Sequence, residues 1–103
     1  MTEPSRIRAQ ATPTGAVVRV LMNHEMETGQ RKDAAGKIIA AWHITHVTAT
    51  LNGRPVLTAD WGPGISKNPF LQFTLKGAKA GDRVAIGWLD NRGATRTDEA
   101  VVA

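Results

Sequence analysis

Short segments in which apolar and polar residues alternate are the feature that most limits how this chain can fold. Every second side chain is apolar in residues 70–76 and 84–88, and residues 43–51 show the same pattern. Alternation with a period of two residues predicts β-strands that bury one face. No stretch of about 11 residues or more has a helical period, and Gly36 interrupts the nearest candidate, residues 33–42. We therefore predict an all-β fold.

Turn residues divide the chain into seven predicted strands. Asn52-Gly53 lies between two apolar runs and predicts a tight hairpin, because a type I′ turn needs positive φ at both central positions. Residues 90–93 suit a type I turn that Gly93 closes in the left-handed conformation. The predicted strands are residues 7–9, 16–22, 43–51, 54–60, 70–76, 84–88 and 95–102. We expect residues 16–22, a run of β-branched side chains, to be largely buried on both faces. Seven short strands in about 100 residues are typical of an immunoglobulin-like β-sandwich of antiparallel strands, with an up-and-down barrel as the alternative.

The length of 103 residues allows one hydrophobic core. We predict a flexible N-terminal tail at residues 1–5 and a single domain at residues 6–103. The tail lacks the apolar segment of a secretion signal, so we expect no signal in this chain. The longest apolar run, residues 38–42, is far shorter than the roughly 20 residues that span a bilayer. No membrane partner is therefore expected.

Charge and cysteine content exclude further classes of function. Thirteen lysines and arginines against nine acids give a net charge of +4, and the cations are spread along the chain. A nucleic-acid-binding protein more often concentrates them in a patch or stripe, so we predict no nucleic-acid partner. Cysteine is absent, which removes disulfides, thiol nucleophiles and cysteine-ligated metals.

The candidate catalytic and metal-binding groups fail on spacing. Residues 24–28 begin like the H-E-x-x-H zinc motif, but Thr28 stands where the second histidine is needed. His43 and His46 are three residues apart, which places them on opposite faces of a strand. The loop around Glu27 holds equal numbers of acids and bases, which favours ion pairing over an acid–base pair. We predict no catalytic residue, no metal and no cofactor. A metal-dependent hydrolase built on His24 and Glu27 is an alternative.

Two connections, residues 23–37 and 60–69, are longer than a hairpin needs, and loops of that length tend to be functional. Trp42 and Trp61 flank them. If exposed, these tryptophans would suit a partner surface, and if covered they would belong to the rim of the core. Trp88 continues the apolar face of residues 84–88 and is expected in the core. A second interpretation is therefore a stand-alone sandwich that binds a carbohydrate or a cell-surface ligand.

Several blocks of sequence occur in order along the chain. They are Met26-Glu27-Thr28-Gly29-Gln30-Arg31-Lys32-Asp33, Gly36-Lys37-Ile38-Ile39, Leu51-Asn52-Gly53-Arg54-Pro55-Val56-Leu57, Ser66-Lys67-Asn68-Pro69, Gly77-Ala78-Lys79-Ala80-Gly81-Asp82 and Asp90-Asn91-Arg92-Gly93. With these blocks the chain resembles the SoxZ family, the small subunits of the SoxYZ sulfur carrier complex in thiosulfate oxidation. The resemblance covers residues 7–102, and the blocks at 27–33 and 66–69 are its most specific part.

The resemblance implies an immunoglobulin-like β-sandwich that forms a heterodimer with SoxY. In that family the sulfur substrate is carried on a cysteine in the Gly-rich C-terminal arm of SoxY, which agrees with the absence of cysteine here. The subunit would be non-catalytic, would stabilise SoxY and would dock other Sox enzymes transiently. The resemblance also implies a periplasmic location, reached by export together with SoxY. The chain departs from its relatives at Glu25 and Ala40, where they have proline, and at Trp42-His43, where they have His-Phe.

We expect the two long loops and the start of the third strand to build the partner-facing surface. The predicted partner-binding residues are Met26, Glu27, Thr28, Arg31, Asp33, Trp42, Ile44, Lys67, Asn68 and Pro69. Replacing Arg31 or Asn68 with alanine should then weaken the heterodimer or slow sulfur transfer, and leave the melting temperature nearly unchanged.

Overall fold

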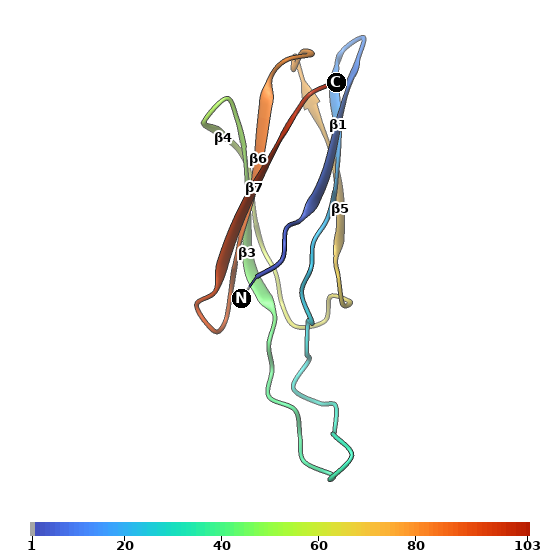
Figure 1. The fold of residues 1–103 in the computed structure, drawn as a ribbon, viewed down its shortest axis with the longest axis vertical. Helices are drawn as coiled ribbons and strands as arrows, with labels where there is room; N and C mark the ends of the chain where they lie inside the picture. Colours follow the sequence, from blue (N-terminus) through green and yellow to red (C-terminus); the bar gives the residue numbers. More distant parts are fainter. Residues whose placement is uncertain (1) are drawn as a thin grey trace.

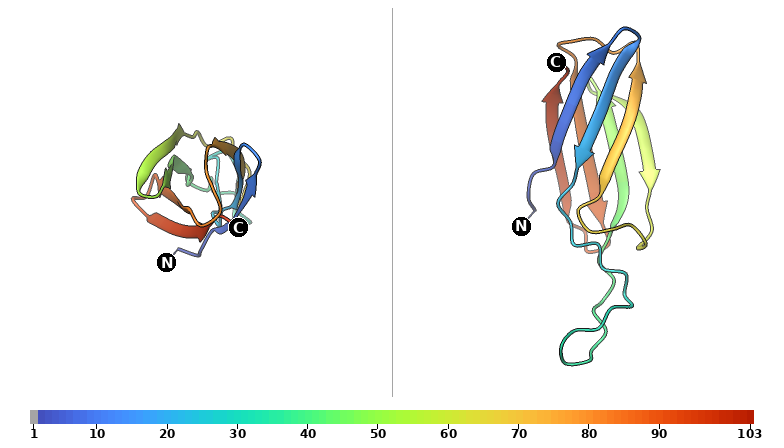
Figure 2. Two further views of the ribbon diagram at one scale, coloured as in Figure 1. Left: turned by 90° about the horizontal axis from the view of Figure 1, so that it is seen from above. Right: turned by 90° about the vertical axis from the view of Figure 1, so that its right-hand side faces the viewer.

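A computed structural model describes residues 2–103, in which seven antiparallel strands form two sheets packed face to face (Figures 1 and 2). The strands are β1 (Arg6–Thr12), β2 (Gly15–Leu21), β3 (Ile44–Leu51), β4 (Arg54–Asp60), β5 (Phe70–Lys76), β6 (Arg83–Asp90) and β7 (Thr95–Val101). One sheet has the order β1-β2-β5 and the other the order β4-β3-β6-β7. The predicted all-β sandwich is confirmed, because two separate sheets exclude a closed barrel. Residues 2–103 hold no helix of the length and apolar character needed to cross a membrane.

Turn chemistry fixes the hairpins that the sequence predicts. Asn52 and Gly53, between β3 and β4, have φ angles of 51° and 82°, as a type I′ turn requires. Between β6 and β7, Gly93 is left-handed with a φ of 82°, and its N–H donates to the carbonyl of Asp90 at 3.1 Å. Both predicted turns are confirmed.

The hydrophobic core fills the space between the two sheets with small aliphatic side chains. Val18 and Val20 contribute from one sheet, and Val47 and Ile86 from the other, all with no exposed surface. Trp88 on β6 is also buried, as predicted. The core is therefore formed by the inward-facing positions of strands that alternate between buried and more exposed residues.

The burial of β2 differs from the prediction. Residues 16–22 were expected to be largely buried on both faces, but Arg19 and Leu21 are exposed and Val17 is only half-buried. That prediction is wrong, because β2 is the middle strand of a three-stranded sheet whose outer face no other element covers.

The residues before β1 are tied to the sandwich by two hydrogen bonds. The N–H of Ser5 donates to Asp98 Oδ2 at 2.8 Å, and Asn23 Nδ2 donates to the carbonyl of Pro4 at 2.7 Å. Of the tail predicted at residues 1–5, Met1 lies outside the described residues. The flexibility of the tail stays a prediction.

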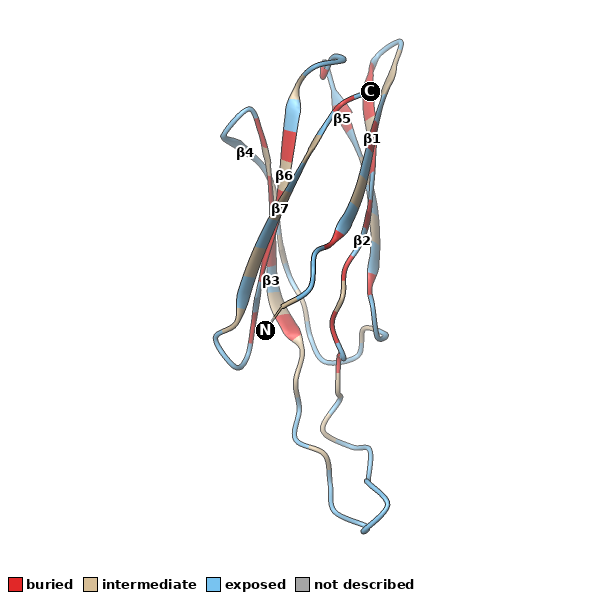
Figure 3. Ribbon diagram, viewed as in Figure 1, coloured by how far each residue is buried: buried red, intermediate tan, exposed pale blue. Residues whose placement is uncertain are grey.

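Residues 22–43 connect β2 to β3, and residues 23–43 extend away from one end of the sandwich as a long projection (Figures 1 and 3). The projection gives the molecule its elongated shape, with extents of 53 × 21 × 20 Å. This connection continues past the predicted limit at residue 37, because residues 38–42 make only isolated β-bridges and no strand.

Candidate partner-binding site

The projection has two parts with different surroundings. Its neck, formed by His24, Met26 and Trp42, packs against the end of the sandwich, and His24 and Met26 are buried there. Its tip, residues 30–41, is exposed throughout except for the half-buried Ile39 (Figure 3). The neck and the tip therefore need separate explanations.

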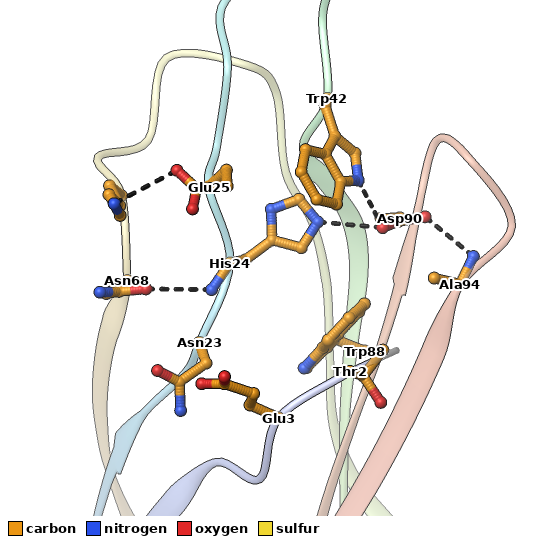
Figure 4. A pocket seen from close by; sticks show the side chains of 11 residues that line it. Thr2, Glu3, Asn23, His24, Glu25, Trp42, Asn68, Trp88, Asp90 and Ala94 are labelled. Carbon is orange, nitrogen blue, oxygen red and sulfur yellow. Dashed lines mark hydrogen bonds and ion pairs between the residues drawn. The ribbon is translucent and has the colours of Figure 1, made fainter.

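A buried carboxylate, Asp90 at the end of β6, organises the neck (Figure 4). His24 Nε2 donates to Asp90 Oδ2 at 3.0 Å, and the indole Nε1–H of Trp42 donates to the same oxygen at 2.8 Å. The other oxygen, Oδ1, accepts the backbone N–H groups of Arg92 and Ala94, each at 2.9 Å. Both carboxylate oxygens are therefore fully used in joining the projection to the sandwich.

The charge of Asp90 is stabilised by these donors. Burial raises the pKa of the carboxyl group, but the hydrogen bonds from His24, Trp42, Ala94 and Arg92 together outweigh burial and lower the pKa below its ordinary value. Asp90 is thus an ionised group inside the protein that is compensated by hydrogen bonds alone. Such a group holds its donors strongly in place.

The hydrogen bonds of His24 settle what its ring can do. The backbone N–H of Met26 donates to His24 Nδ1 at 3.1 Å, so Nδ1 is an acceptor and Nε2 carries the N–H whose hydrogen bond Asp90 Oδ2 accepts. Both ring nitrogens are committed, and the ring has no lone pair left for a metal. Residues 2–103 contain no cluster of three or more histidine, cysteine, aspartate or glutamate side chains that could hold a metal ion. The hydrolase alternative therefore lacks its first ligand.

The aromatic side chains of the neck pack on each other. The ring centroids of His24 and Trp42 are 4.9 Å apart, and the guanidinium of Arg92 lies 4.1 Å from the ring centroid of Trp42. Trp88 meets His24 edge-on at 5.3 Å. Because Trp42 is packed in this way, it belongs to the rim of the core and offers no flat, open ring on which a sugar could stack. Trp61 is also half-buried and packs against the core, so neither of the tryptophans that the carbohydrate interpretation requires is fully exposed.

The second long connection, residues 61–69, braces the neck. Asn68 Oδ1 accepts the N–H of His24 at 3.1 Å, and the N–H of Asn68 donates to the carbonyl of His24 at 2.9 Å. Asn68 adopts a left-handed φ of 51°, which asparagine tolerates better than most residues. Lys67 forms an ion pair with Glu25 at 3.2 Å. The two loops that the sequence marked as functional therefore lie side by side.

Backbone hydrogen bonds give the tip its shape. The N–H of Ile39 donates to the carbonyl of Arg31 at 2.8 Å, within a two-armed segment that turns at residues 33–37. In that turn, Asp33 Oδ1 accepts the N–H of Ala35 at 2.9 Å and the N–H of Lys37 at 3.0 Å. The tip is therefore a narrow hairpin-like arm that has no core of its own.

Side chains of the projection form one ion pair and one exposed apolar site. Arg31 binds Glu27 through two hydrogen bonds, of 2.6 and 3.1 Å, and this bonding lowers the pKa of Glu27. The pair agrees with the predicted ion pairing inside the loop. Ile38 is 63% exposed, the most exposed of the large apolar side chains in residues 2–103.

The ten predicted partner-binding residues fall into four groups. Met26, Ile44 and Pro69 are buried in this chain. Trp42, Lys67 and Asn68 lie at the neck and its brace. Glu27 and Thr28 lie between the neck and the tip, and Arg31 and Asp33 lie in the tip. Sequence reasoning missed Asp90 as an organiser of the neck, because its partner His24 is 66 positions away along the chain. It also passed over Ile38 as a surface residue.

A pocket of about 420 Å³ opens beside the neck (Figure 4). Glu3, Asn23 and Lys67 contribute to its wall, together with His24 and Trp88. The indole N–H of Trp88 is buried and has no hydrogen-bond partner within residues 2–103. The pocket is thus walled on one side by the neck network and on another by the residues that precede β1.

Comparison with known proteins gives one assignment. The family model described as sulphur oxidation protein SoxZ matches residues 6–101, nearly the whole chain. No curated protein matches the chain. The matched residues include all seven strands, the projection and its brace. The chain therefore belongs to the SoxZ family of sulfur oxidation proteins.

Proposed function

We propose that this chain is the non-catalytic subunit of a SoxYZ sulfur carrier complex in thiosulfate oxidation. It pairs with a SoxY-like protein, which holds the sulfur intermediate on the cysteine of its C-terminal arm, and it helps present that arm to Sox enzymes. Membership of the SoxZ family supports a role in sulfur oxidation. The chain has no cysteine with which to carry sulfur itself.

The exposed tip of the projection is the observation that carries the proposed pairing. Fixing the backbone of each residue costs about 1–2 kcal/mol of conformational entropy, and burial of apolar surface normally offsets that cost. Residues 30–41 bury almost nothing in the chain by itself. A partner that packs against the tip supplies the missing burial, with Ile38 as the apolar anchor.

The neck supports this role by holding the arm in one orientation. Hydrogen bonds from His24 and Trp42 to Asp90 tie both sides of the projection to β6. The bond between His24 and Asn68 ties the first side to the second loop as well. A rigid mount lowers the entropy lost when a partner binds. His24 and Asp90 are thus used for positioning, which agrees with a subunit that performs no catalysis.

The proposed complex works in the periplasm, and the chain is exported in the folded state together with SoxY. A domain that completes its core without disulfides suits such a route. The enzymes that act on the sulfur-loaded C-terminal arm of SoxY dock transiently and complete the proposed cycle.

Co-expression with a SoxY-like protein of the same organism tests the proposal. We expect a 1:1 heterodimer by size-exclusion chromatography with light scattering, and added sulfur mass on the partner's cysteine after incubation with thiosulfate and its enzymes. In a shortened variant, a glycine-rich turn replaces residues 30–41. This variant should have the melting temperature of the wild type and should no longer pair with SoxY. A wild-type chain that stays monomeric in the presence of SoxY would contradict the proposed function. Full pairing by the shortened variant would contradict the role of the tip.

A further inference from the structure

The β1-β2-β5 sheet turns its outer face toward the viewer in the right-hand view of Figure 2. The charged side chains of that face are all cations, with no acid among them. They are Arg6, Arg8, Arg19 and Lys76, all exposed. The remaining outward side chains of these strands are polar or apolar and uncharged. None of the four cations forms an ion pair with any residue in 2–103. Positions dispersed along the sequence are thus gathered by strand pairing into one basic surface, which we call the cationic face.

The cationic face accounts for the net charge of the molecule. The chain has 13 lysines and arginines and 9 acids, for a net charge of +4. Apart from the four cations of this face, the other basic residues equal the acids in number. The cationic face therefore carries a charge of +4 with no acid among its outward side chains.

Two of these arginines are placed at a cost in stability. Arg8 on β1 and Arg19 on β2 are direct cross-strand neighbours. Like charges directly opposite each other in a sheet are destabilising. The Nε of Arg19 is held by Gln72 Oε1 at 3.2 Å, on the third strand of the sheet. An unfavourable pair kept on a face without any compensating acid indicates that the compensating charge comes from another molecule.

An apolar site adjoins the cations at the end of the face from which the projection starts. Leu21 and Phe70 are cross-strand neighbours and are 42% and 56% exposed. Arg6 is paired with Leu21 on the other side. An aromatic and an aliphatic side chain beside arginines is the composition of a protein–protein interface, where aromatic residues and arginine are enriched.

The outer face of the other sheet differs in charge. Its charged side chains pair with each other, Arg83 with Glu99 at 3.7 Å and His46 with Asp60 at 3.3 Å. Its centre is made of small uncharged residues, with Thr48 opposite Gly87 and Gly87 opposite Thr97. Of the two outer sheet faces, the cationic face is therefore the one whose charged side chains are all of one sign.

We infer that the cationic face docks an acidic protein surface carrying an apolar side chain that packs on Leu21 and Phe70. Arginine matches carboxylate pairs through two parallel hydrogen bonds, and opposite fields raise the rate of encounter. The inference rests on the proposed function in one respect: the acidic protein is an enzyme that acts on the carrier complex, docking on a face that the SoxY-like partner leaves open. Exposed charges give a contact that salt weakens, as a transient enzyme–carrier encounter requires.

The test uses the reconstituted heterodimer of this chain with its SoxY-like partner, and the Sox enzymes of the same organism as probes. The variant Arg8→Glu/Arg19→Glu reverses the central charges, and Arg54→Glu/Lys79→Glu makes the same change in net charge at exposed positions away from the face. Pairing with SoxY is measured first, and then the KM of each enzyme for the sulfur-loaded heterodimer over a range of salt concentrations.

We expect normal pairing by both variants. For at least one enzyme, the KM should rise about tenfold or more with Arg8→Glu/Arg19→Glu, and its salt dependence should flatten. The control variant should change the KM little. Normal pairing with an unchanged KM for every enzyme would overturn the inference alone, and loss of pairing by Arg8→Glu/Arg19→Glu would assign the face to SoxY instead. Binding of duplex DNA by the wild-type heterodimer at physiological salt, abolished by the same variant, would assign it to nucleic acid. Failure of the wild-type chain to pair would overturn the proposed function and this inference with it.

Discussion

Two turns of this chain share one local structure and have opposite surroundings. In residues 33–37 and 90–94, an aspartate Oδ1 accepts the N–H groups two and four positions later. The fourth residue is a left-handed glycine in both, Gly36 with a φ of 81° and Gly93 with a φ of 82°. Asp33 is exposed at the tip of the projection, whereas Asp90 is 3% exposed and also binds two side chains of the neck. Local sequence thus sets the turn, and distant partners set what the turn does.

Removal of the two aspartates is the strongest way to test that comparison. Asp90→Ala should lower the free energy of unfolding by about 3–5 kcal/mol, because it leaves four donors, one buried and three partly buried, without an acceptor. Asp33→Ala removes the same two backbone bonds in an exposed turn and should cost at most about 1 kcal/mol. Urea unfolding followed by tryptophan fluorescence measures both values. Equal losses in the two variants would show that the turn itself, and not the neck network, stabilises the fold.

Acid unfolding is a second test of the role of Asp90 in the neck. Folding lowers the pKa of Asp90 below the value of about 3.9 that an aspartate has in an unfolded chain. Its contribution to stability is therefore complete above about pH 4 and is lost as the pH falls through the lower pKa of the folded state. The pKa of Asp98 is also lowered, chiefly by its bonds from Arg96, and adds to the loss over the same range. The pKa values of Glu27 and Asp82 are lowered as well. In Asp90→Asn, the loss below about pH 4 should therefore shrink to the part that these other three carboxyl groups supply. An unchanged acid profile would contradict the assignment.

The brace at Asn68 gives a smaller effect of the same kind. Asn68→Ala removes the acceptor for the N–H of His24 and places a Cβ-bearing residue of lower tolerance at a φ of 51°. We expect a loss of about 1–2 kcal/mol. Asn68→Gly keeps the backbone conformation and loses only the hydrogen bond, so it should cost less. The structure thus revises the expectation that Asn68→Ala leaves the melting temperature nearly unchanged. A null result for both variants would restore that expectation.

The strands and their turns could be predicted from the sequence because their signals are local. The alternation at Val84, Ile86 and Trp88 and the Asn52-Gly53 pair lie within a few residues of each other, and the structure confirms both. The burial of β2 could not be predicted, because a β-branched run is the same whether a sheet is covered on one face or on two. Exposure of Arg19 depends on the sheet order, which no local pattern contains.

The candidate site was only partly predictable for the same reason. The two long loops were identified from their length, and the structure places them side by side. Their roles were not, because His24 and Asp90 meet through folding across 66 positions and Asp90 carries no mark in the sequence beyond its turn. The cationic face could not be predicted from the sequence for the same reason. Arg8 and Arg19 are separated along the chain, and only the register of β1 and β2 makes them neighbours.

The tip of the projection should show the opposite behaviour to the neck, with no effect on stability and a clear effect on binding. Ile38→Asp replaces the apolar anchor with a charge at a side chain that is already 63% exposed, so the melting temperature should not change. Arg31→Ala removes an exposed ion pair with Glu27, which contributes little to folding. Each substitution should weaken pairing with the SoxY-like protein by about tenfold or more, because anchors at the centre of an interface account for most of its binding energy.

Val56→Asp is the matched control for the tip, since Val56 is an exposed apolar residue on β4, far from the arm. Its affinity for the SoxY-like protein, measured by surface plasmon resonance, should equal that of the wild type. If Ile38→Asp and Arg31→Ala pair normally and lower the melting temperature, the tip is scaffold like the neck, and the contrast between the two aspartate turns reflects burial alone. If they lose affinity at full stability, the same loop joins a structural network at its base to a binding element at its end. The rigid neck is then what allows a narrow, coreless arm to meet its partner in one orientation.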